Sequence, residues 1–176
     1  MMRIPSEGVL ILDGATGTEL ERRGVDTGLP LWSAGAILDA PEVLLDIHSE
    51  YLRAGSGAII ANTFRTHQRS LAKSGLGSQA ESITAEAVRI ACRARDSVNP
   101  DALVFGSVAP LEDCYSPELT PDMETCQREH GQIIGHLLDA GVDLVLIETM
   151  CSSREAIAAA KAAEVSGSGQ WGISFC

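Results

Sequence analysis

The stretch VDLVLIETM, Val142–Met150, is a largely apolar run that reaches an acidic side chain near its end. Apolar residues that do not alternate with polar ones are typical of a parallel strand buried on both faces. Four further stretches have the same character: Val9–Asp13, Gly57–Phe64, Ala102–Pro110 and Trp171–Cys176. The sequence therefore predicts five strands of a parallel sheet.

The segments between these strands carry signals for helices. The predicted helix starts are, in chain order, Asp39 with Pro41 and Glu42, Ser78 with Glu81, Thr120 with Pro121, and Ser152 with Glu155. A capping Asp, Ser or Thr, a proline in the first turn and an acid three residues after the cap are usual features of a helix N-terminus. We expect Gly55 and Gly141 to end the first and third of these helices.

Strands that alternate with helices require a parallel sheet with right-handed crossovers, and two architectures satisfy this. One is a doubly wound sheet, and the other is part of a (β/α)8 TIM barrel. The turn GATG at 14–17 does not match the G-x-G-x-x-G fingerprint of dinucleotide-binding sheets. We therefore favour the α/β TIM barrel, of which this chain supplies about four βα units plus a fifth strand, since a full barrel takes about 250 residues.

Composition argues against several classes of partner. The chain has 176 residues and a formal net charge of −11, so neither nucleic acid nor an anionic membrane is an expected partner. No apolar run reaches the roughly 18 to 20 residues that a membrane helix needs. The five cysteines are scattered without a close pair, which favours reduced thiols in the cytoplasm over a disulfide framework.

Glu148 is the most informative polar residue, because it interrupts the run LVLIETM, where an unpaired carboxylate is costly. One interpretation is that it receives a cationic group, such as the ammonium of a substrate. The alternatives are an internal ion pair with an arginine, or a cap for the helix that begins near Ser152.

Asp13 ends the first predicted strand, and Asn62 and Thr63 end the second. Asp13 either orients a ligand or accepts hydrogen bonds from the turn amides at 14–17. Free amides in this glycine-containing turn could hold a carboxylate. Asp13 and Glu148 with such amides between them would suit an amino acid.

Other chemistries find less support. Lys73 and Lys161 fall in helical segments, so a Schiff base has no candidate at a strand end. No serine lies in a nucleophile elbow. His67 follows the second strand, but a lone histidine is weak evidence for a site.

Four stretches, in this order along the chain, resemble the homocysteine S-methyltransferase family: ILDGATGTELERRGVD, LWSA, HSEYLRAGSGAIIANTF and DLVLIETM. The resemblance covers essentially the whole chain. It implies a (β/α)8 barrel and the transfer of a methyl group to the thiol of homocysteine, which gives methionine. Donors within the family are S-methylmethionine, S-adenosylmethionine, betaine, or methylfolate by way of a cobalamin, and the sequence does not choose among them.

The resemblance also implies roles for particular residues. Asp13 and Gly14 fall in the family's homocysteine-binding turn, Asn62 and Thr63 fall near the substrate, and Glu148 falls on the acid that takes the substrate ammonium. A zinc ion binds the substrate sulfur in this family, because zinc favours the thiolate form. The family's cysteine ligands lie in a Gly-x-Asn-Cys-like turn and a Gly-Gly-Cys-Cys-like stretch, and this chain has neither motif.

We therefore expect residues 1–176 to be the N-terminal portion of a homocysteine-binding TIM-barrel domain. The rest of the barrel, or a second copy in a homo-oligomer, would cover its open sheet edges. The alternative is a truncated, non-catalytic relative that binds an amino acid or assembles with a partner chain. A further hypothesis is that Cys114, Cys151 and Cys176, which follow consecutive predicted strands, meet and bind a metal.

Overall fold

A computed structural model describes residues 8–176 and contains one parallel sheet. Its strands, in spatial order as well as chain order, are β1 (Ala58–Ala61), β2 (Leu103–Val108), β3 (Leu144–Met150) and β4 (Trp171–Phe175). Every pairing between neighbours is parallel, with Ile59 opposite Val104 in the first pair. Four of the five predicted strands are therefore confirmed.

The first predicted strand, Val9–Asp13, is wrong as a strand. Only Leu12 forms an isolated parallel bridge, to Ala58. The segment runs beside β1, and the amides of Gly57 and Ala58 both donate to the Ile11 carbonyl oxygen. Among the described residues it has no strand partner on its other side. Of its apolar side chains only Leu10 packs against the sheet, and Val9 is 90% exposed, so little apolar burial stabilises a longer ladder.

Seven α-helices lie in the described part of the chain. They are α1 (Thr16–Arg22), α2 (Ala36–Asp39), α3 (Pro41–Arg53), α4 (Gln68–Ala72), α5 (Ala80–Val98), α6 (Met123–Asp139) and α7 (Ser153–Val165). Short 3-10 turns are η1 (Trp32–Gly35), η2 (Gly77–Gln79) and η3 (Pro117–Leu119). The four longest helices, α3, α5, α6 and α7, are the four that the sequence predicts.

Several predicted caps are wrong, although the helices exist. Asp39 is the last residue of α2, and the cap of α3 is Ala40. Gln79 caps α5 without a side-chain hydrogen bond, because Ser78 lies inside the preceding 3-10 turn. Asp122 caps α6 and accepts from an amide in its first turn, so that helix begins two residues after the predicted Thr120-Pro121 start.

The helix α7 starts where predicted, but its capping box is absent. Ser152 is the cap residue and makes no side-chain capping hydrogen bond. Glu155 turns away from the helix end and is 1% exposed. Its carboxylate accepts hydrogen bonds from other segments, so these tertiary contacts replace the hydrogen bond of the predicted capping box.

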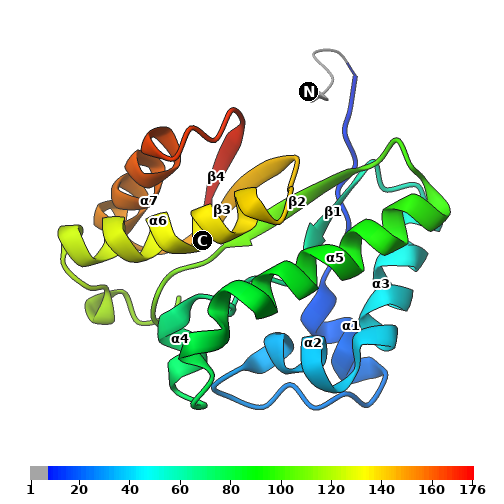
Figure 1. Cartoon of the computed structure of the whole chain (residues 1–176), viewed down its shortest axis with the longest axis horizontal. Helices are drawn as coiled ribbons and strands as arrows, with labels where there is room; N and C mark the ends of the chain where they lie inside the picture. Colours follow the sequence, from blue (N-terminus) through cyan, green and yellow to red (C-terminus); the bar gives the residue numbers. More distant parts are fainter. Residues whose placement is uncertain (1–7) are drawn as a thin grey trace.

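The main core lies on one face of the sheet, under α3, α5, α6 and α7, which follow one another around the strands (Figure 1). Buried side chains from both layers meet there, among them Leu52, Val88, Ile134 and Ala159 from the helices and Ile59, Val104 and Ile147 from the strands. The cluster on the opposite face holds only strand residues and Leu10. A doubly wound sheet would have helices on both faces.

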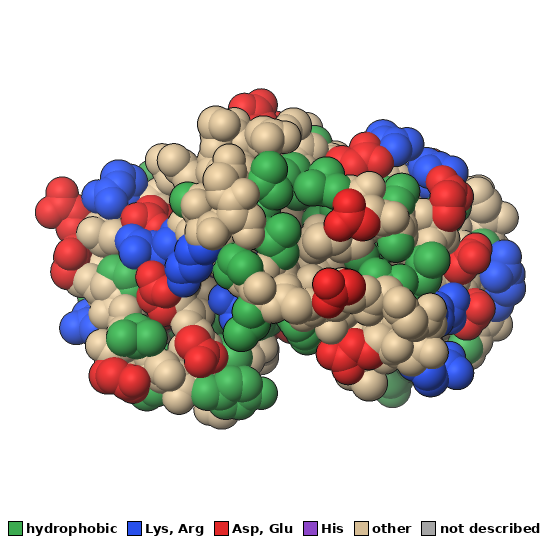
Figure 2. Space-filling view, turned by 90° about the horizontal axis from the view of Figure 1, so that it is seen from below, with side chains coloured by type: hydrophobic (Ala, Val, Ile, Leu, Met, Phe, Trp, Pro, Cys, Tyr) green, Lys and Arg blue, Asp and Glu red, His purple; other side chains and the backbone are tan. Residues whose placement is uncertain are grey.

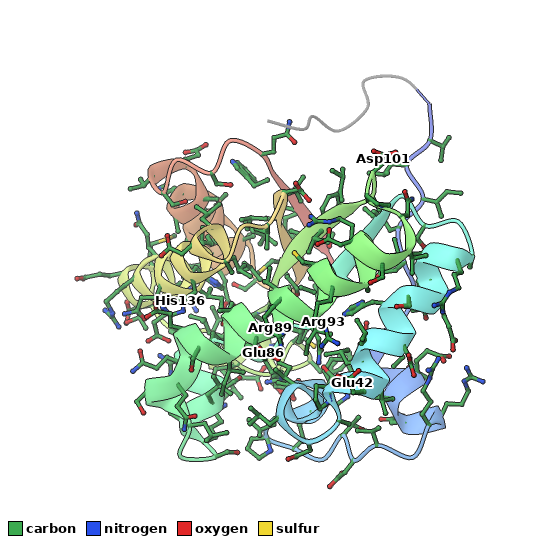
Figure 3. All side chains as sticks on the ribbon, turned by 45° about the vertical axis from the view of Figure 1, so that its right-hand side comes forward. Glu42, Glu86, Arg89, Arg93, Asp101 and His136 are labelled. Atoms are coloured by element: carbon green, nitrogen blue, oxygen red, sulfur yellow. The ribbon has the colours of Figure 1, made fainter. Side chains whose placement is uncertain are left out.

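The outer side of these helices is charged. Figure 3 shows Glu86, Arg89 and Arg93 along α5, with Glu42 of α3 beside them. Arg89 pairs with Glu86, and Arg93 lies 3.5 Å from a Glu42 carboxylate oxygen. Within residues 8–176, no helix is long and apolar enough to cross a membrane.

His48 of α3 gives the fold a measurable pH dependence. It is fully buried, and neither ring nitrogen has a hydrogen-bond partner among the described residues. Burial lowers its pKa from 6.5 to about 4. Between pH 6.5 and about 4, His48 is protonated in the unfolded chain but stays neutral in the folded chain. Stability is therefore lost as the pH falls from 6.5 toward 4.

We expect His48 to cost about 2 kcal/mol of unfolding free energy between about pH 7.5 and about pH 5. Urea denaturation at both pH values measures this loss. The His48→Leu variant cannot titrate at this position and should lose correspondingly less stability over the same interval. An equal loss in both proteins would contradict the assignment.

Candidate functional site

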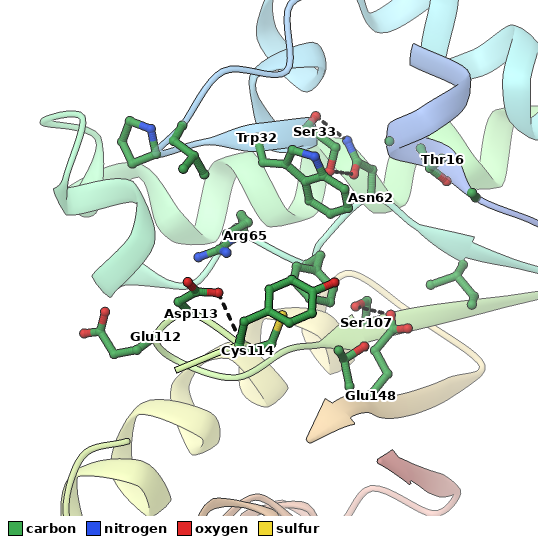
Figure 4. Close-up of a pocket in the computed structure, with 18 of the residues that line it drawn as sticks. Thr16, Trp32, Ser33, Asn62, Arg65, Ser107, Glu112, Asp113, Cys114 and Glu148 are labelled. Atoms are coloured by element: carbon green, nitrogen blue, oxygen red, sulfur yellow. Dashed lines mark hydrogen bonds between the residues drawn. The ribbon is translucent and has the colours of Figure 1, made fainter. Parts of the chain in front are cut away.

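A pocket of about 830 Å³ lies where the loops that follow the strands meet. Its walls include Gly14, Trp32, Asn62, Arg65, Ser107 and Glu148 (Figure 4). The short helices α1, α2 and α4 gather at this end of the molecule in Figure 1. Figure 2 views that end and shows hydrophobic side chains in its middle, around a hollow, with acidic and basic side chains on both flanks. A cavity of this size suits a small molecule.

Glu148 lies in this pocket and keeps a carboxylate without a cationic partner. Its Oε1 accepts a hydrogen bond from the Ser107 hydroxyl at 2.5 Å. Burial raises the pKa of Glu148, and the Ser107 hydrogen bond acts in the opposite direction. Within residues 8–176 no basic side chain lies within the 4.0 Å of an ion pair, and Glu148 does not cap α7, so both structural alternatives are wrong.

Regular alternation along β3 points Glu148 to the same face as Leu144 and Leu146, and a distortion at the end of the strand brings Thr149 to the pocket beside it. The register of β3 against β4 shifts between Ile147 and Met150, and Thr149 has a φ of 60°. Neighbouring side chains of a regular strand point to opposite faces, yet both Glu148 and Thr149 line the pocket. A β-branched residue rarely adopts this left-handed backbone, and such strain is often found at functional sites.

The Asp13 side chain joins the turn to the sheet, and its backbone neighbour Gly14 lines the pocket. Asp13 Oδ2 accepts from the Ile60 amide at 2.9 Å, whereas Oδ1 is buried without a hydrogen-bond partner in the described part of the chain. Burial raises the pKa of Asp13 to about 7, and the nearby Glu148 carboxylate adds to the rise. The bond to Ile60 replaces the expected bonds to the turn amides.

Asn62 and Thr63 make different connections. Asn62 lines the pocket, accepts from the Ser33 hydroxyl at 2.8 Å and donates to the Ser33 carbonyl oxygen at 2.7 Å. These two bonds fix the loop that carries Trp32. The Thr63 hydroxyl donates to the Ser107 carbonyl oxygen and accepts from the Ser107 amide, each at 2.9 Å, so it joins β1 to β2.

Sequence reasoning missed three residues that shape the pocket. Ser107 binds Glu148, and its signal is a hydroxyl inside the apolar run of β2. Trp32 and Ser33 belong to the LWSA stretch, but nothing in their spacing places them over the strand ends. The Trp32 ring packs edge-on against Phe64, with ring centroids 5.6 Å apart, and its backbone φ is 48°.

The wall formed by Trp32 depends on Gly17. A Cβ atom at Gly17 would lie 2.5 Å from Cζ2 of Trp32, which Phe64 holds from another side. We expect Gly17→Ala to lower the unfolding free energy by about 1–3 kcal/mol and to weaken ligand binding by displacing the ring.

Gly135→Ala is the matched control for this substitution. Gly135 lies in α6 with open space around it, so alanine should be neutral or stabilising there. Urea denaturation of the two variants decides the matter. Equal unfolding free energies of Gly17→Ala and Gly135→Ala would show that the Trp32 ring moves aside without destabilising the fold.

A buried hydrogen-bond network around Glu155 supports the loop on the opposite wall. Glu155 Oε1 accepts from the Leu111 amide at 2.8 Å and lies 3.1 Å from Nε2 of His130. The Thr120 hydroxyl is 3.4 Å from Oε2. Burial acts to raise the pKa of Glu155, but these hydrogen bonds more than offset it and hold the pKa below its usual value. Leu111 and Thr120 bracket the loop whose side chains at 112–115 line the pocket.

No group of three metal-binding side chains occurs within residues 8–176, so the hypothesis of a Cys114, Cys151 and Cys176 site is wrong. Cys176 is exposed, and its thiol points to the Thr149 carbonyl oxygen at 3.7 Å. Burial raises the pKa of Cys114 and Cys151, which disfavours the thiolates that a metal needs. The described residues therefore do not fit the zinc that the family resemblance implies.

Comparisons with known proteins point to one family. The family model described as homocysteine S-methyltransferase matches residues 10–176. A homocysteine S-methyltransferase of Escherichia coli is 34% identical over 160 residues, which cover 84% of this chain and 52% of that protein. A selenocysteine Se-methyltransferase of Brassica oleracea is 33% identical over 88% of this chain and 51% of its own length.

Solved structures agree. The metallated form of the homocysteine methyltransferase MmuM from Escherichia coli superposes with a TM-score of 0.85 at 32% identity. The superposition covers 97% of this chain and 63% of that structure. The chain thus spans about half the length of the curated relatives it matches.

Proposed function

Because the chain belongs to the homocysteine S-methyltransferase family, we propose that it takes part in transferring a methyl group to the thiol of homocysteine, which gives methionine. The observation that carries this proposal is the unpaired Glu148 carboxylate in the pocket. The family resemblance implies that Glu148 is the acid that takes the substrate ammonium. The relatives' names do not give the methyl donor, and we leave it open.

In the proposed complex, the ammonium of homocysteine lies against Glu148. Ser107 orients that carboxylate by its hydrogen bond. Gly14 and the following turn, which line the pocket, offer backbone amides to the substrate carboxylate. Asp13 holds this turn to β1, and Thr63 joins β1 to β2. Asn62 fixes the segment that carries Trp32.

We also propose that the sheet of β1 to β4 is a segment of a (β/α)8 barrel. Strands in chain order with helices on one face support this assignment. At one edge Val9 is exposed, and at the other Phe175 is 64% exposed. The rest of a barrel, or a second chain, would cover both edges.

Activation of the substrate sulfur has no residue assigned to it here. The zinc of the family would favour the thiolate, but residues 8–176 do not fit that ion. What these residues do is bind and orient the amino-acid end of the substrate. We place the protein in a reducing compartment, the cytoplasm, because its five cysteines are free.

The test combines binding and turnover with the same protein. We expect calorimetry to detect homocysteine binding, and we expect methionine to form from homocysteine and a donor once the rest of the barrel is supplied. Binding without methionine formation from any of the four family donors would favour the alternative, a non-catalytic amino-acid-binding relative. If homocysteine does not bind, the proposal is wrong.

A further inference from the structure

Arg65 is a second charged group in the pocket, and it has no partner of opposite charge. It follows β1 and lines the same cavity as Glu148. Its Nε atom is buried and makes no hydrogen bond to any described residue. No carboxylate oxygen between residues 8 and 176 comes within the 4.0 Å of an ion pair. The side chain as a whole is half-buried, but a buried guanidinium nitrogen without an acceptor is costly unless a ligand supplies one.

The other basic side chains nearby are already paired. Arg69 donates to both carboxylate oxygens of Glu129, at 2.8 and 2.7 Å, and to Glu112 at 3.1 Å. Lys73 donates to Glu112 at 2.7 Å. Arg65 is therefore the cation that this cluster leaves available to a ligand.

Aromatic packing fixes the place of Arg65. Its Cζ atom lies 5.9 Å from the centroid of the Phe64 ring, within range of a cation–π contact. Phe64 in turn packs edge-on against Trp32. A guanidinium group held in this way presents a planar fork of donors, which matches the two oxygens of a carboxylate.

Figure 4 shows Arg65 and Glu148 toward different ends of the pocket, with Asp113 on the loop that faces Arg65. Asp113 is exposed, and its Oδ1 accepts from the Tyr115 amide at 3.1 Å. This carboxylate is the group that would compete with an anionic ligand for Arg65. The pocket thus has Glu148 toward one end, and Arg65 with Asp113 opposite it toward the other.

We propose that Arg65 binds the carboxylate of an amino-acid ligand, in the part of the pocket away from Glu148. The ligand class rests on the proposed function. Because the turn after Gly14 takes the homocysteine carboxylate in the proposed complex, we assign the Arg65 carboxylate to a methyl donor that is itself an amino acid. Homocysteine is the alternative source, and a cavity of about 830 Å³ has room for both molecules. The two sources share one chemistry and are separated by experiment.

The experiment compares Arg65→Gln with the unchanged protein, using three probes: homocysteine, S-methylmethionine and 3-aminopropane-1-thiol, which is homocysteine without its carboxylate. We expect Arg65→Gln to weaken S-methylmethionine binding at least about tenfold. The carboxylate-free probe should bind the variant and the unchanged protein equally. Loss of homocysteine affinity assigns the carboxylate to the substrate, and loss of S-methylmethionine affinity assigns it to the donor.

Controls separate charge recognition from folding. Arg65→Lys should restore part of the affinity, and Asp113→Asn should increase it by removing the competing carboxylate. Arg89→Gln, on the exposed face of α5, should change nothing. The proposal fails if Arg65→Gln leaves both carboxylate probes unaffected, or if it weakens all three probes equally.

These outcomes can be told apart from failure of the proposed function. If Glu148→Gln weakens homocysteine binding and Arg65→Gln changes neither carboxylate probe, the ammonium site stands and the carboxylate site fails. The reverse pattern leaves Arg65 as an anion site and removes the ammonium assignment. If the unchanged protein binds none of the probes, both proposals are wrong.

Discussion

Glu148→Gln is expected to weaken homocysteine binding by about 2 kcal/mol or more, which is roughly 30-fold. The substitution keeps the shape of the side chain and an oxygen that can accept from Ser107, so the hydrogen bond at 2.5 Å has a replacement. What it removes is the negative charge in a half-buried pocket. The substrate ammonium would then lose its water without gaining a counter-ion.

Two further variants sharpen this prediction. Ser107→Ala removes one neutral donor and should cost about 1 kcal/mol, less than the loss of the charge. Glu164→Gln, at an exposed position of α7, removes the same charge far from the strand ends and should leave the affinity unchanged. Calorimetric titration of homocysteine measures all three. Equal affinity in Glu148→Gln and Glu164→Gln would remove Glu148 from the site.

Glu155→Ala is expected to lower the unfolding free energy by about 3–5 kcal/mol. It would leave the Leu111 amide without its acceptor and His130 without its partner, both in the interior. It would also release the loop between Leu111 and Thr120, which forms one wall of the pocket. Urea denaturation gives the stability, and homocysteine titration under folding conditions gives the effect on the wall.

Two comparisons keep this second prediction specific. Glu155→Gln retains an acceptor for Leu111, so it should cost less than the alanine variant. Glu164→Ala lies on the same helix but is exposed, and a change within about 0.5 kcal/mol is expected there. If Glu155→Ala and Glu164→Ala destabilise equally, the buried network does not stabilise the loop.

Much of the fold can be predicted from the sequence, because buried parallel strands have a local signature. β3 and β2 are apolar runs in chain order, and both lie where that pattern predicts. Val9–Asp13 has the same pattern and runs beside β1, but only Leu12 forms a bridge there. Apolar composition therefore identifies the segment but does not decide whether it pairs.

Helix starts were less predictable, because capping competes with tertiary contacts. Ser152 and Glu155 have the spacing of a capping box, but the Glu155 carboxylate satisfies Leu111 and His130 instead. The competing partners lie 44 and 25 residues away along the chain. Local spacing carries no information about them.

Some residues of the candidate site could likewise be predicted from the sequence, and others could not. Glu148 and Asn62 stand at strand ends, where the topology of a parallel sheet brings them together, and both line the pocket. Arg65 and Trp32 come from loops, and their place depends on packing between rings. The left-handed backbone of Thr149, which accompanies the position of its side chain beside Glu148 in the pocket, has no sequence signal because threonine rarely adopts it.

The central claim is that the pocket recognises the ammonium group of homocysteine. The most direct measurement is a calorimetric titration of the unchanged protein with homocysteine and with 4-mercaptobutyrate, which has the same thiol and carboxylate but no amino group. We predict that homocysteine binds at least about tenfold more tightly, because only it gives Glu148 a cation. Equal affinity for the two compounds would contradict the claim.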